Sequence, residues 1–454
     1  MVFSSILFIF RFLPIFLILY FAAPGRTKNL VLLVGSLFFY AWGEPVYISL
    51  MIFSTVLDYS TGRLAAYGHA TNRAGLARLG LCISVCANLG LLAFFKYSGA
   101  VALPIGISFY TFQTMSYTID CYRKEIKPEK NFLDFAVYVT LFPQLIAGPI
   151  VKYRDVSANL HNRRADIDKI SYGCKRFVYG LAKKVLLANN IGLIWNEISS
   201  MNYQTLPTFT AWIGIVAFAL QIYFDFSGYS DMAIGLGAIL GFDFPENFNY
   251  PYISKSITEF WRRWHMTLGS WFREYVYIPL GGNKKGLRRQ LFNILVVWML
   301  TGIWHGAGWN FACWGLWFAI WLLLEKTILL RLFEKVPNVF RHAYTLLIVL
   351  VSWTFFEINT GLSDFLRALF HLNGADFFRT TTEIGSSYDI TRFYLNENLV
   401  IFTVALIAAT PVTKTKLCNK IMTYIEIPML VVLFILSVAY IVDASYNPFL
   451  YFRF

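Results

Sequence analysis

The chain has 454 residues, of which 57% are hydrophobic and only 14% are charged. Because soluble proteins carry roughly 25% charged residues, this composition excludes an ordinary soluble enzyme and indicates a polytopic membrane protein. The net charge of +13 does not indicate nucleic-acid binding, since the basic residues lie in short loops between apolar blocks. The six cysteines form no CxxC pair, so we expect neither a metal site nor a bound cofactor.

Apolar blocks recur along the whole chain, and each predicts a membrane span or near-span. In chain order they are Phe3–Phe21, Asn29–Trp42, Val46–Leu64, Leu79–Phe95, Phe132–Leu145, Cys174–Trp195, Phe209–Phe224, Asp231–Leu240, Phe292–Trp304, Phe311–Leu330, Ala343–Phe356, Leu399–Ala409 and Ile427–Val442. Several are shorter than a full span and lie beside Pro or Gly, which predicts broken or re-entrant helices buried in protein. We therefore expect one all-α membrane domain over residues 1–454, with about 10–12 crossing helices.

Basic loops predict the orientation of the chain in the membrane. The densest is Lys284–Arg289, and Lys152–Lys184 carries further clusters. The positive-inside rule places both in the cytosol. Such a surface would attract anionic membrane lipids or an anionic cytosolic ligand. His265 and His305 flank the first loop, so the two imidazoles can meet inside the membrane if both segments enter it from that side.

The stretch 260–310 concentrates costly polar residues within an apolar chain, which makes it the expected reaction centre. His305 is predicted on an apolar helix between Gly302 and Gly306, which lie four apart and share a helix face. Helix packing explains the two glycines but not the histidine. A neutral buried imidazole is a usable base. A structurally satisfied core histidine is the alternative.

The stretch Glu259–Trp271 is predicted as one helix. Trp261, Trp264 and His265 fall on a single face, and Arg262 and Arg263 can pair with Glu259. An interfacial amphipathic helix with an aromatic belt is one interpretation. The other is that His265 faces the same cavity as His305.

Two further motifs have open interpretations. Asp225 and Asp231 lie beside apolar segments, where they can carry protons for a transporter, bind a cation or cap a helix. Residues 281–286, which include Asn283, Lys284 and Lys285, resemble a phosphate cradle in composition but lack P-loop spacing. The alternative for that segment is a solvated basic turn.

Several motifs occur together and in order: Gln144–Pro149, Gln221–Asp231, Pro245–Phe248, Phe260–His265, Tyr277–Asn283 and Trp304–Ala307, followed by the ending Tyr446–Phe449. In these motifs the chain resembles the membrane-bound O-acyltransferase (MBOAT) family, with the strongest likeness over residues 94–326. The closest branch resembles the membrane subunit of bacterial alginate O-acetylation. The D-alanine transfer protein of teichoic acid synthesis is a more distant match.

The resemblance implies a ring of helices around a thin centre with a central tunnel. His305 corresponds to the family's signature histidine, and His265 to its second polar position. The implied reaction moves an acetyl group from a cytosolic thioester, acetyl-CoA, to a hydroxyl of an exported cell-envelope polysaccharide, directly or through an extracytoplasmic acetyltransferase partner. The alternatives are D-alanyl transfer from an acyl carrier protein, or a transporter. The implied location is the cytoplasmic membrane.

The candidate site residues follow from the motifs and the resemblance together. His305 is the expected general base, and His265 is expected to orient the donor or to stabilise the developing oxyanion. The candidate substrate-binding residues are Trp261, Trp264, Arg262, Trp304, Asn283, Lys284, Lys285 and Asp225.

Overall fold

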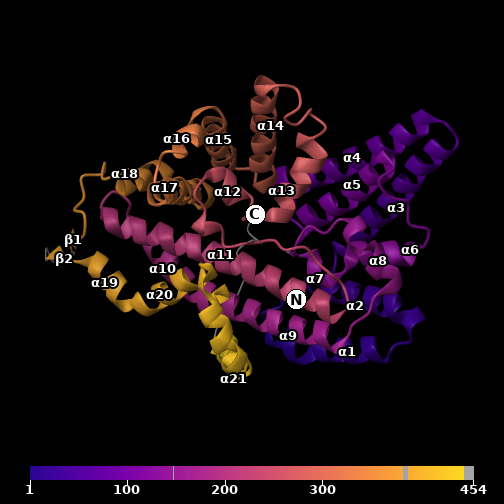
Figure 1. The fold of residues 1–454 in the computed structure, drawn as a ribbon, viewed down its shortest axis with the longest axis horizontal. Helices are drawn as coiled ribbons and strands as arrows, with labels where there is room; N and C mark the ends of the chain where they lie inside the picture. The colour runs from indigo at the N-terminus through magenta and orange to yellow at the C-terminus, as the bar shows by residue number, and fades with distance from the viewer. Residues whose placement is uncertain (147, 382–386, 444–454) are drawn as a thin grey trace.

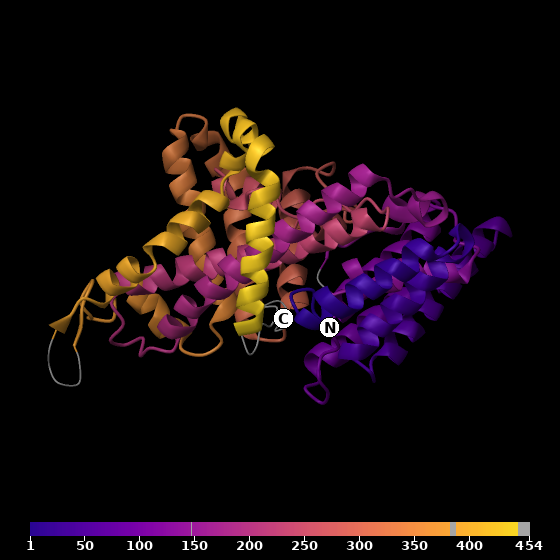
Figure 2. The same cartoon turned by 90° about the horizontal axis from the view of Figure 1, so that it is seen from below.

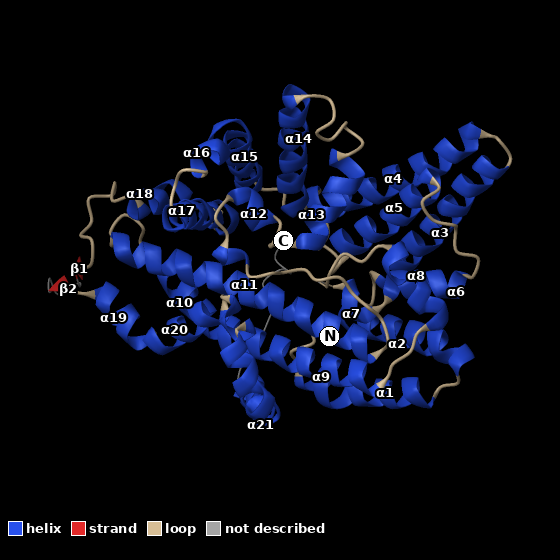
Figure 3. Cartoon of the chain, in the orientation of Figure 1, coloured by secondary structure: helices blue, strands red, loops and turns tan. Residues whose placement is uncertain are grey.

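The computed structural model describes residues 1–146, 148–381 and 387–443, and most of them are helical (Figure 3). The α-helices are α1 (Leu13–Ala22), α2 (Lys28–Gly43), α3 (Ile48–Ala70), α4 (Ala74–Tyr97), α5 (Ile107–Arg123), α6 (Phe132–Thr140), α7 (Phe142–Leu145), α8 (Tyr153–Asn162), α9 (Ile167–Ala182), α10 (Asn189–Ser199), α11 (Thr208–Ile239), α12 (Ile257–Trp261), α13 (Met266–Phe272), α14 (Leu287–His305), α15 (Trp309–Leu324), α16 (Leu330–Phe333), α17 (Asn338–Glu357), α18 (Leu362–Leu369), α19 (Ile390–Glu397), α20 (Leu399–Ala408) and α21 (Lys416–Asp443).

Shorter elements complete the fold. There are π-helical turns η1 (Phe8–Phe12), η3 (Lys183–Ala188), η5 (Arg273–Tyr277) and η6 (Glu325–Leu329), and 3-10 turns η2 (Gly25–Thr27), η4 (Pro251–Ile253) and η7 (Pro411–Lys414). Two-residue strands β1 (Thr380–Thr381) and β2 (Ser387–Tyr388) pair antiparallel at one edge (Figure 3). The motif Tyr446–Phe449 lies outside the described residues, as does Ala147 within the motif Gln144–Pro149.

Membrane-spanning helices are present, but fewer meet the criteria of length and composition than expected. Within the described ranges, five pass: Ala74–Tyr97, Ile167–Ser199, Thr208–Ile239, Asn338–Glu357 and Lys420–Asp443. A sixth is possible if α19 and α20, bent by 63° at their junction, form one broken span. The all-α polytopic architecture is confirmed. The number is below the predicted 10–12 because apolar blocks such as Phe132–Leu145 form short helices, here α6 and α7.

Helix α11 is continuous through the segment where the sequence analysis listed two separate apolar blocks, Phe209–Phe224 and Asp231–Leu240. Every residue from Ile222 to Ile239 is buried, including Asp225 and Asp231. Asp225 forms an ion pair with Lys184 of η3 at 2.5 Å, and Asp231 forms ion pairs with Arg176 and Lys183 from the α9–η3 segment. Neither aspartate caps a helix, so that interpretation was wrong. Basic side chains from the α9–η3 segment compensate the two negative charges, so the buried helix α11 continues without a break.

Two apolar cores lie on opposite sides of the molecule, and α11 belongs to both. The first core includes α1, α2, α5 and the later part of α11, whereas the second includes the earlier part of α11 with α15, α17 and α18. Figure 1 shows the two groups of helices on the two sides, with α9 and α11 crossing between them. The view from below in Figure 2 shows the same division, with α21 standing across the middle.

Glycines allow close packing of two helix pairs. A Cβ atom on Gly228 of α11 would lie 2.7 Å from the carbonyl oxygen of Gly180 in α9. A Cβ atom on Gly302 of α14 would lie 2.5 Å from the carbonyl oxygen of Phe311 in α15. The predicted packing role of Gly302 is therefore confirmed. Gly306 does not share that helix face, because α14 ends at His305 and Gly306 is extended.

Candidate active site

A cavity of about 890 Å³ lies between α12, α13, η5, α14 and the junction of α15 with η6. Its described lining includes five basic side chains and no carboxylate. The five are Arg262, Arg273, Lys284, Lys285 and Lys326. We call this space the basic cavity. Its charge favours an anionic ligand, while Trp261, Trp298 and other apolar side chains line the rest of its wall.

His265 lines this cavity because the chain breaks between α12 and α13. The predicted single helix over Glu259–Trp271 is wrong: His265 adopts φ 44°, in the left-handed region, and precedes α13. The backbone N–H of Met266 donates instead to the carbonyl oxygen of Asn247 at 2.9 Å, and that of Asn249 to Arg263. These non-helical bonds compensate the break. They press the 247–249 segment against the turn and bury the His265 side chain, which is 2% exposed.

Asn247 is the direct hydrogen-bond partner of His265. The His265 Nδ1 atom lies 3.0 Å from the Asn247 Oδ1 atom, which also accepts from the hydroxyl of Thr267 at 2.9 Å. The Asn247 side-chain N–H donates to the hydroxyl of Ser230 in α11 at 3.1 Å. The other imidazole nitrogen, Nε2, is buried and has no hydrogen-bond partner among the described residues.

His305 is the last residue of α14 and is 6% exposed, but it is not part of the described cavity lining. Its ring centroid lies 4.8 Å from that of Trp304, 4.9 Å from Trp314 and 5.2 Å from Phe356. Phe109 connects the two histidine neighbourhoods, with centroids 6.4 Å from His265 and 6.2 Å from Trp304. Both imidazoles therefore lie buried in one aromatic region.

The structure gathers six of the ten candidate site residues around the basic cavity: His265, Trp261, Arg262, Asn283, Lys284 and Lys285. The other four lie elsewhere. His305 and Trp304 lie in the aromatic region. Trp264 is buried against Phe260 and Trp353, because the chain break turns it away from His265. Asp225 is held in its ion pair with Lys184.

Several residues at the site were not singled out from the sequence. Arg273 and Lys326 line the basic cavity but stand alone in sequence, outside any basic cluster. Lys96 donates to the carbonyl oxygen of Trp304, and its ammonium lies 5.5 Å from the centre of that ring. Lys96 directly follows the apolar run Leu79–Phe95. A charged residue at the end of such a run is the sequence signal that could have pointed to it.

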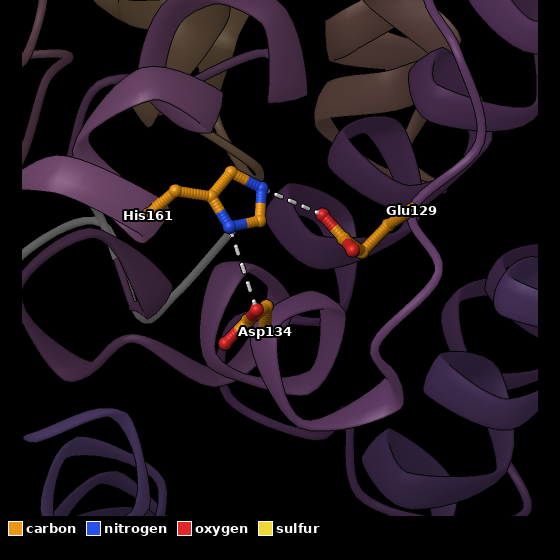
Figure 4. Close-up of side chains that lie close together, drawn as sticks. All are labelled: Glu129, Asp134 and His161. Atoms are coloured by element: carbon orange, nitrogen blue, oxygen red, sulfur yellow. Dashed lines mark ion pairs between the residues drawn. The ribbon is translucent and has the colours of Figure 1, made fainter. Parts of the chain in front are cut away.

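One cluster of ionisable groups lies away from this site (Figure 4). His161 of α8 places its Nε2 atom 3.1 Å from Glu129 and its Nδ1 atom 3.6 Å from Asp134. The ligand atoms of the three residues lie within 4.8 Å of one another, as a metal site requires. The carboxylates are also occupied by hydrogen bonds: the Tyr153 hydroxyl donates to Glu129 at 2.5 Å and the Asn29 amide to Asp134 at 2.5 Å. We therefore interpret the cluster as an ion-pair clamp between α8 and the start of α6.

Comparison with known proteins shows the family of the chain. Residues 103–363 match the model of the membrane-bound O-acyltransferase family. The chain is 42% identical to the "Probable alginate O-acetylase AlgI" of Azotobacter vinelandii over 379 residues, covering 79% of this chain and 75% of the relative. It is 32% identical to the peptidoglycan O-acetyltransferase of Helicobacter pylori, covering 90% and 86%.

A more distant relative is the teichoic acid D-alanyltransferase of Bacillus subtilis, which is 29% identical over 48% of this chain and 57% of the relative. The family model covers more than half of the chain, and the acetylases match over most of their length. Together with the apolar helices, these matches indicate a membrane O-acetyltransferase. The chain is an acyl-transferring enzyme and belongs to the membrane-bound O-acyltransferase family.

Proposed function

We propose that the enzyme, in the cytoplasmic membrane, transfers an acetyl group from acetyl-CoA to a hydroxyl of an exported cell-envelope polysaccharide. The observation that carries this proposal is the basic cavity, which places five cations and the buried imidazole of His265 around one space. Acetyl-CoA carries phosphates at one end and a thioester at the other. Basic side chains suit the phosphates, and an imidazole suits a reaction that moves a proton.

The proposed chemistry needs one proton acceptor and no bound cofactor. A hydroxyl oxygen attacks the thioester carbonyl while its proton passes to an imidazole. The tetrahedral intermediate then expels the CoA sulfur, which takes the proton back, and the ester and free thiol leave. The sequence analysis assigned the acceptor role to His305 and placed His265 beside the donor. Lys284 and Lys285, with Asn283 beside them, are proposed to contact the donor's phosphates.

The acceptor is proposed to approach from the face opposite the cytosol. The acetylase relatives named for alginate and peptidoglycan support a carbohydrate acceptor. The last transfer to the polymer is proposed to go directly or through an extracytoplasmic acetyltransferase partner. A passage from the basic cavity to the opposite face stays a prediction.

The transporter alternative loses its main support. Asp225 and Asp231 were the residues expected to couple transport to an ion gradient. Both are held in ion pairs with the α9–η3 segment. D-alanyl transfer from a carrier protein differs from the proposal in the donor, and the experiment below separates the two.

The test is a transfer assay with purified protein in liposomes. One set of liposomes receives acetyl-CoA labelled in the acetyl group, and the other receives a carrier protein loaded with labelled D-alanine. Both sets contain a soluble oligosaccharide acceptor. Each set is run with and without an added extracytoplasmic acetyltransferase. We expect consumption of acetyl-CoA and label on the oligosaccharide or the partner. Label transferred only from the D-alanyl carrier, or acceptor flux without any loss of thioester, would overturn the proposal.

A further inference from the structure

The last turn of α14, which carries His305, ends inside the protein. An α-helix leaves its last four carbonyl oxygens without hydrogen bonds from its own backbone. The chain does not supply those bonds by turning back on itself, because Gly306 is extended, with φ −172° and ψ 169°. Since Trp304 and His305 are both buried, the carbonyl oxygens of this turn need partners from another element.

Two consecutive residues at the end of α4 supply such partners. The Lys96 ammonium donates to the carbonyl oxygen of Trp304, and the Tyr97 hydroxyl donates to that of Ile303. The donors and acceptors lie 208 and 206 positions apart in the chain, so the bonds join the ends of two helices that are distant in sequence. We call this pair of hydrogen bonds the α14 cap.

The α14 cap explains where the charge of Lys96 lies. A lysine at the end of a membrane helix usually extends its ammonium toward the lipid headgroups. Lys96 instead turns toward α14, where its ammonium lies 5.5 Å from the centre of the Trp304 ring. It forms no ion pair with a carboxylate in the part of the chain that the structure describes. The negative end of the α14 dipole and the electron-rich face of the ring take the place of a counter-ion.

The bond from Lys96 acts directly on the backbone of His305. The Trp304 carbonyl belongs to the peptide unit that contains the nitrogen of His305. The rings of Trp314 and Phe356 stand edge-on to the imidazole, at 4.9 Å and 5.2 Å, and limit its rotation. They do not determine where the helix ends, so the position of the imidazole along α14 depends on the cap. A displacement of about 1 Å near a reacting group can cost about 100-fold in rate.

The surroundings of Lys96 indicate that its loss would have a local effect. The Trp304 side chain is held separately by α5, since its ring stacks on Phe112 at 5.4 Å. Helix α4 is held on its neighbours by buried residues that all precede Lys96, namely Ala77, Gly80, Ser84, Asn88 and Leu92. Removing the ammonium should therefore release the end of α14 and leave the packing of both helices in place.

We infer that Lys96 is a positioning residue for His305: its ammonium holds the last peptide unit of α14 and thereby sets where the imidazole lies. This inference rests on the proposed function, in which His305 accepts the proton of the attacking hydroxyl. Lys96 acts through the backbone of α14 and needs an N–H donor to do so. Tyr97 provides the second bond of the α14 cap, one residue earlier along α14.

Kinetics in the liposome assay give the first test. In Lys96→Ala we expect kcat to fall about 30-fold to 100-fold while KM for acetyl-CoA changes less than about threefold, because the imidazole moves but the basic cavity keeps its lining. Lys96→Arg keeps N–H donors and should retain at least about a third of kcat. Tyr97→Phe should lower kcat about threefold to tenfold, as expected for one neutral hydrogen bond.

The matched control is Lys28→Ala. Lys28 is also half-buried and also lies over an aromatic ring, with its ammonium 5.2 Å from the centre of the Tyr20 ring. It begins α2 and belongs to neither the α14 cap nor the lining of the basic cavity. This variant should keep the wild-type kcat and KM.

Added amines make the test specific for a hydrogen-bond donor. n-Propylammonium supplies the atoms that Lys96→Ala lacks, whereas tetramethylammonium has the same charge and no N–H group. We expect n-propylammonium to raise the kcat of Lys96→Ala at least about fivefold, with saturation, because it restores a charged hydrogen bond. Tetramethylammonium should not raise it. Neither amine should change wild type or Lys28→Ala.

A spectroscopic measurement on His305 makes the test independent of activity. Solid-state NMR of protein labelled with ¹⁵N-histidine identifies the His305 ring signals by their loss in His305→Gln. We expect one narrow set of signals in wild type and in Lys28→Ala. In Lys96→Ala the set should broaden or split, because the end of α14 is released, and n-propylammonium should restore it.

The outcomes separate the two proposals. If wild type consumes no acetyl-CoA, the proposed function fails, and unchanged His305 signals in Lys96→Ala would overturn the inference as well. If wild type is active but Lys96→Ala keeps its kcat, or tetramethylammonium restores activity as well as n-propylammonium, the inference is overturned and the proposed function stands. If Lys96→Ala does not fold, Lys96→Met keeps the length of the side chain without the donor, and a wild-type kcat in that variant is the contradicting result.

Discussion

At the scale of single residues, the position of His265 depends on its own backbone. A left-handed conformation is uncommon for a residue with a side chain, and here it ends the helical path and turns the imidazole toward Asn247. The sequence predicted that His265 and His305 would both be buried, because each belongs to a segment that was expected to enter the membrane. It did not predict the Asn247 contact, because helical periodicity was extended through a residue where the backbone breaks.

His305 provides the first prediction at this scale. His305→Ala should lower acetyl transfer at least 100-fold, an amount in the roughly 10²–10⁴-fold range that a proton-transferring or substrate-orienting group contributes. Transfer of label from acetyl-CoA, normalised to the folded protein recovered by size-exclusion chromatography, is the measurement. His342→Ala is the matched control, because His342 lies on α17, bonds the backbone carbonyl of Ser254 after η4 and is outside the cavity lining. Retained transfer in His305→Ala would remove this residue from the mechanism.

The lysines of the basic cavity provide the second prediction. Lys284→Ala and Lys285→Ala should each raise KM for acetyl-CoA about threefold to tenfold, with kcat nearly unchanged, because exposed ammonium–phosphate contacts contribute to donor binding and not to the reacting bond. Steady-state kinetics at several salt concentrations measure this, and the difference from wild type should shrink as salt rises. Arg288→Ala is the control, since Arg288 lies close by in the first turn of α14 but is not part of the cavity lining. An equal effect of Arg288→Ala would mean that only the overall charge matters.

At the scale of elements, α9 and α11 are held together by both packing and charge. Their glycines bring the backbones close, and the α9–η3 segment supplies the cations for Asp225 and Asp231. The sequence analysis listed two separate apolar blocks here, Phe209–Phe224 and Asp231–Leu240, which the structure joins in one buried helix. The compensating partners of the two aspartates lie between 41 (225 − 184) and 55 positions earlier, a separation that local sequence patterns do not reveal.

The α9–α11 contact gives a packing prediction. Gly228→Ala should destabilise the protein by about 1–3 kcal/mol, because the new methyl group would lie 2.7 Å from the Gly180 carbonyl oxygen. Gly90→Ala in α4 is the matched control: nothing lies within 4 Å of its added Cβ atom, so the usual helix preference should stabilise it by about 0.4–1 kcal/mol. Thermal unfolding in detergent compares them. Equal unfolding temperatures for the two variants would contradict the close-packing argument.

The clamp of α8 against α6 gives a pH prediction. Burial raises the pKa of Glu129, but hydrogen bonds donated by the Asn131 backbone N–H and the Tyr153 hydroxyl, together with the charge of His161, lower it on balance below its ordinary value of 4.5. Because the folded-state pKa is the lower one, ionised Glu129 stabilises the fold above about pH 4.5, and this contribution is lost as the pH falls through the folded-state value.

The measurement is the unfolding temperature in detergent between about pH 7 and pH 3.5. Wild type should lose more stability over this range than Glu129→Gln, which is already uncharged. Exposed Glu197→Gln should follow wild type. Parallel curves for wild type and Glu129→Gln would show that the carboxylate does not contribute in this way.

At the scale of the whole molecule, composition and block length were enough to predict an all-α membrane protein, and the ordered motifs were enough to predict its family. They overestimated the number of long spans, because apolar blocks such as Phe132–Leu145 are used here as short buried helices. Only part of the lining of the basic cavity could be predicted from the sequence. The loop lysines form a visible cluster, whereas Arg273 and Lys326 reach the same space from separate elements.

Helix α11 supplies residues to both apolar cores, so neither half can lose its packing without disturbing a helix that the other half needs. The two sides of the enzyme should consequently melt as one cooperative unit. A fragment cut on either side of Thr208–Ile239 should not persist as an independently stable domain.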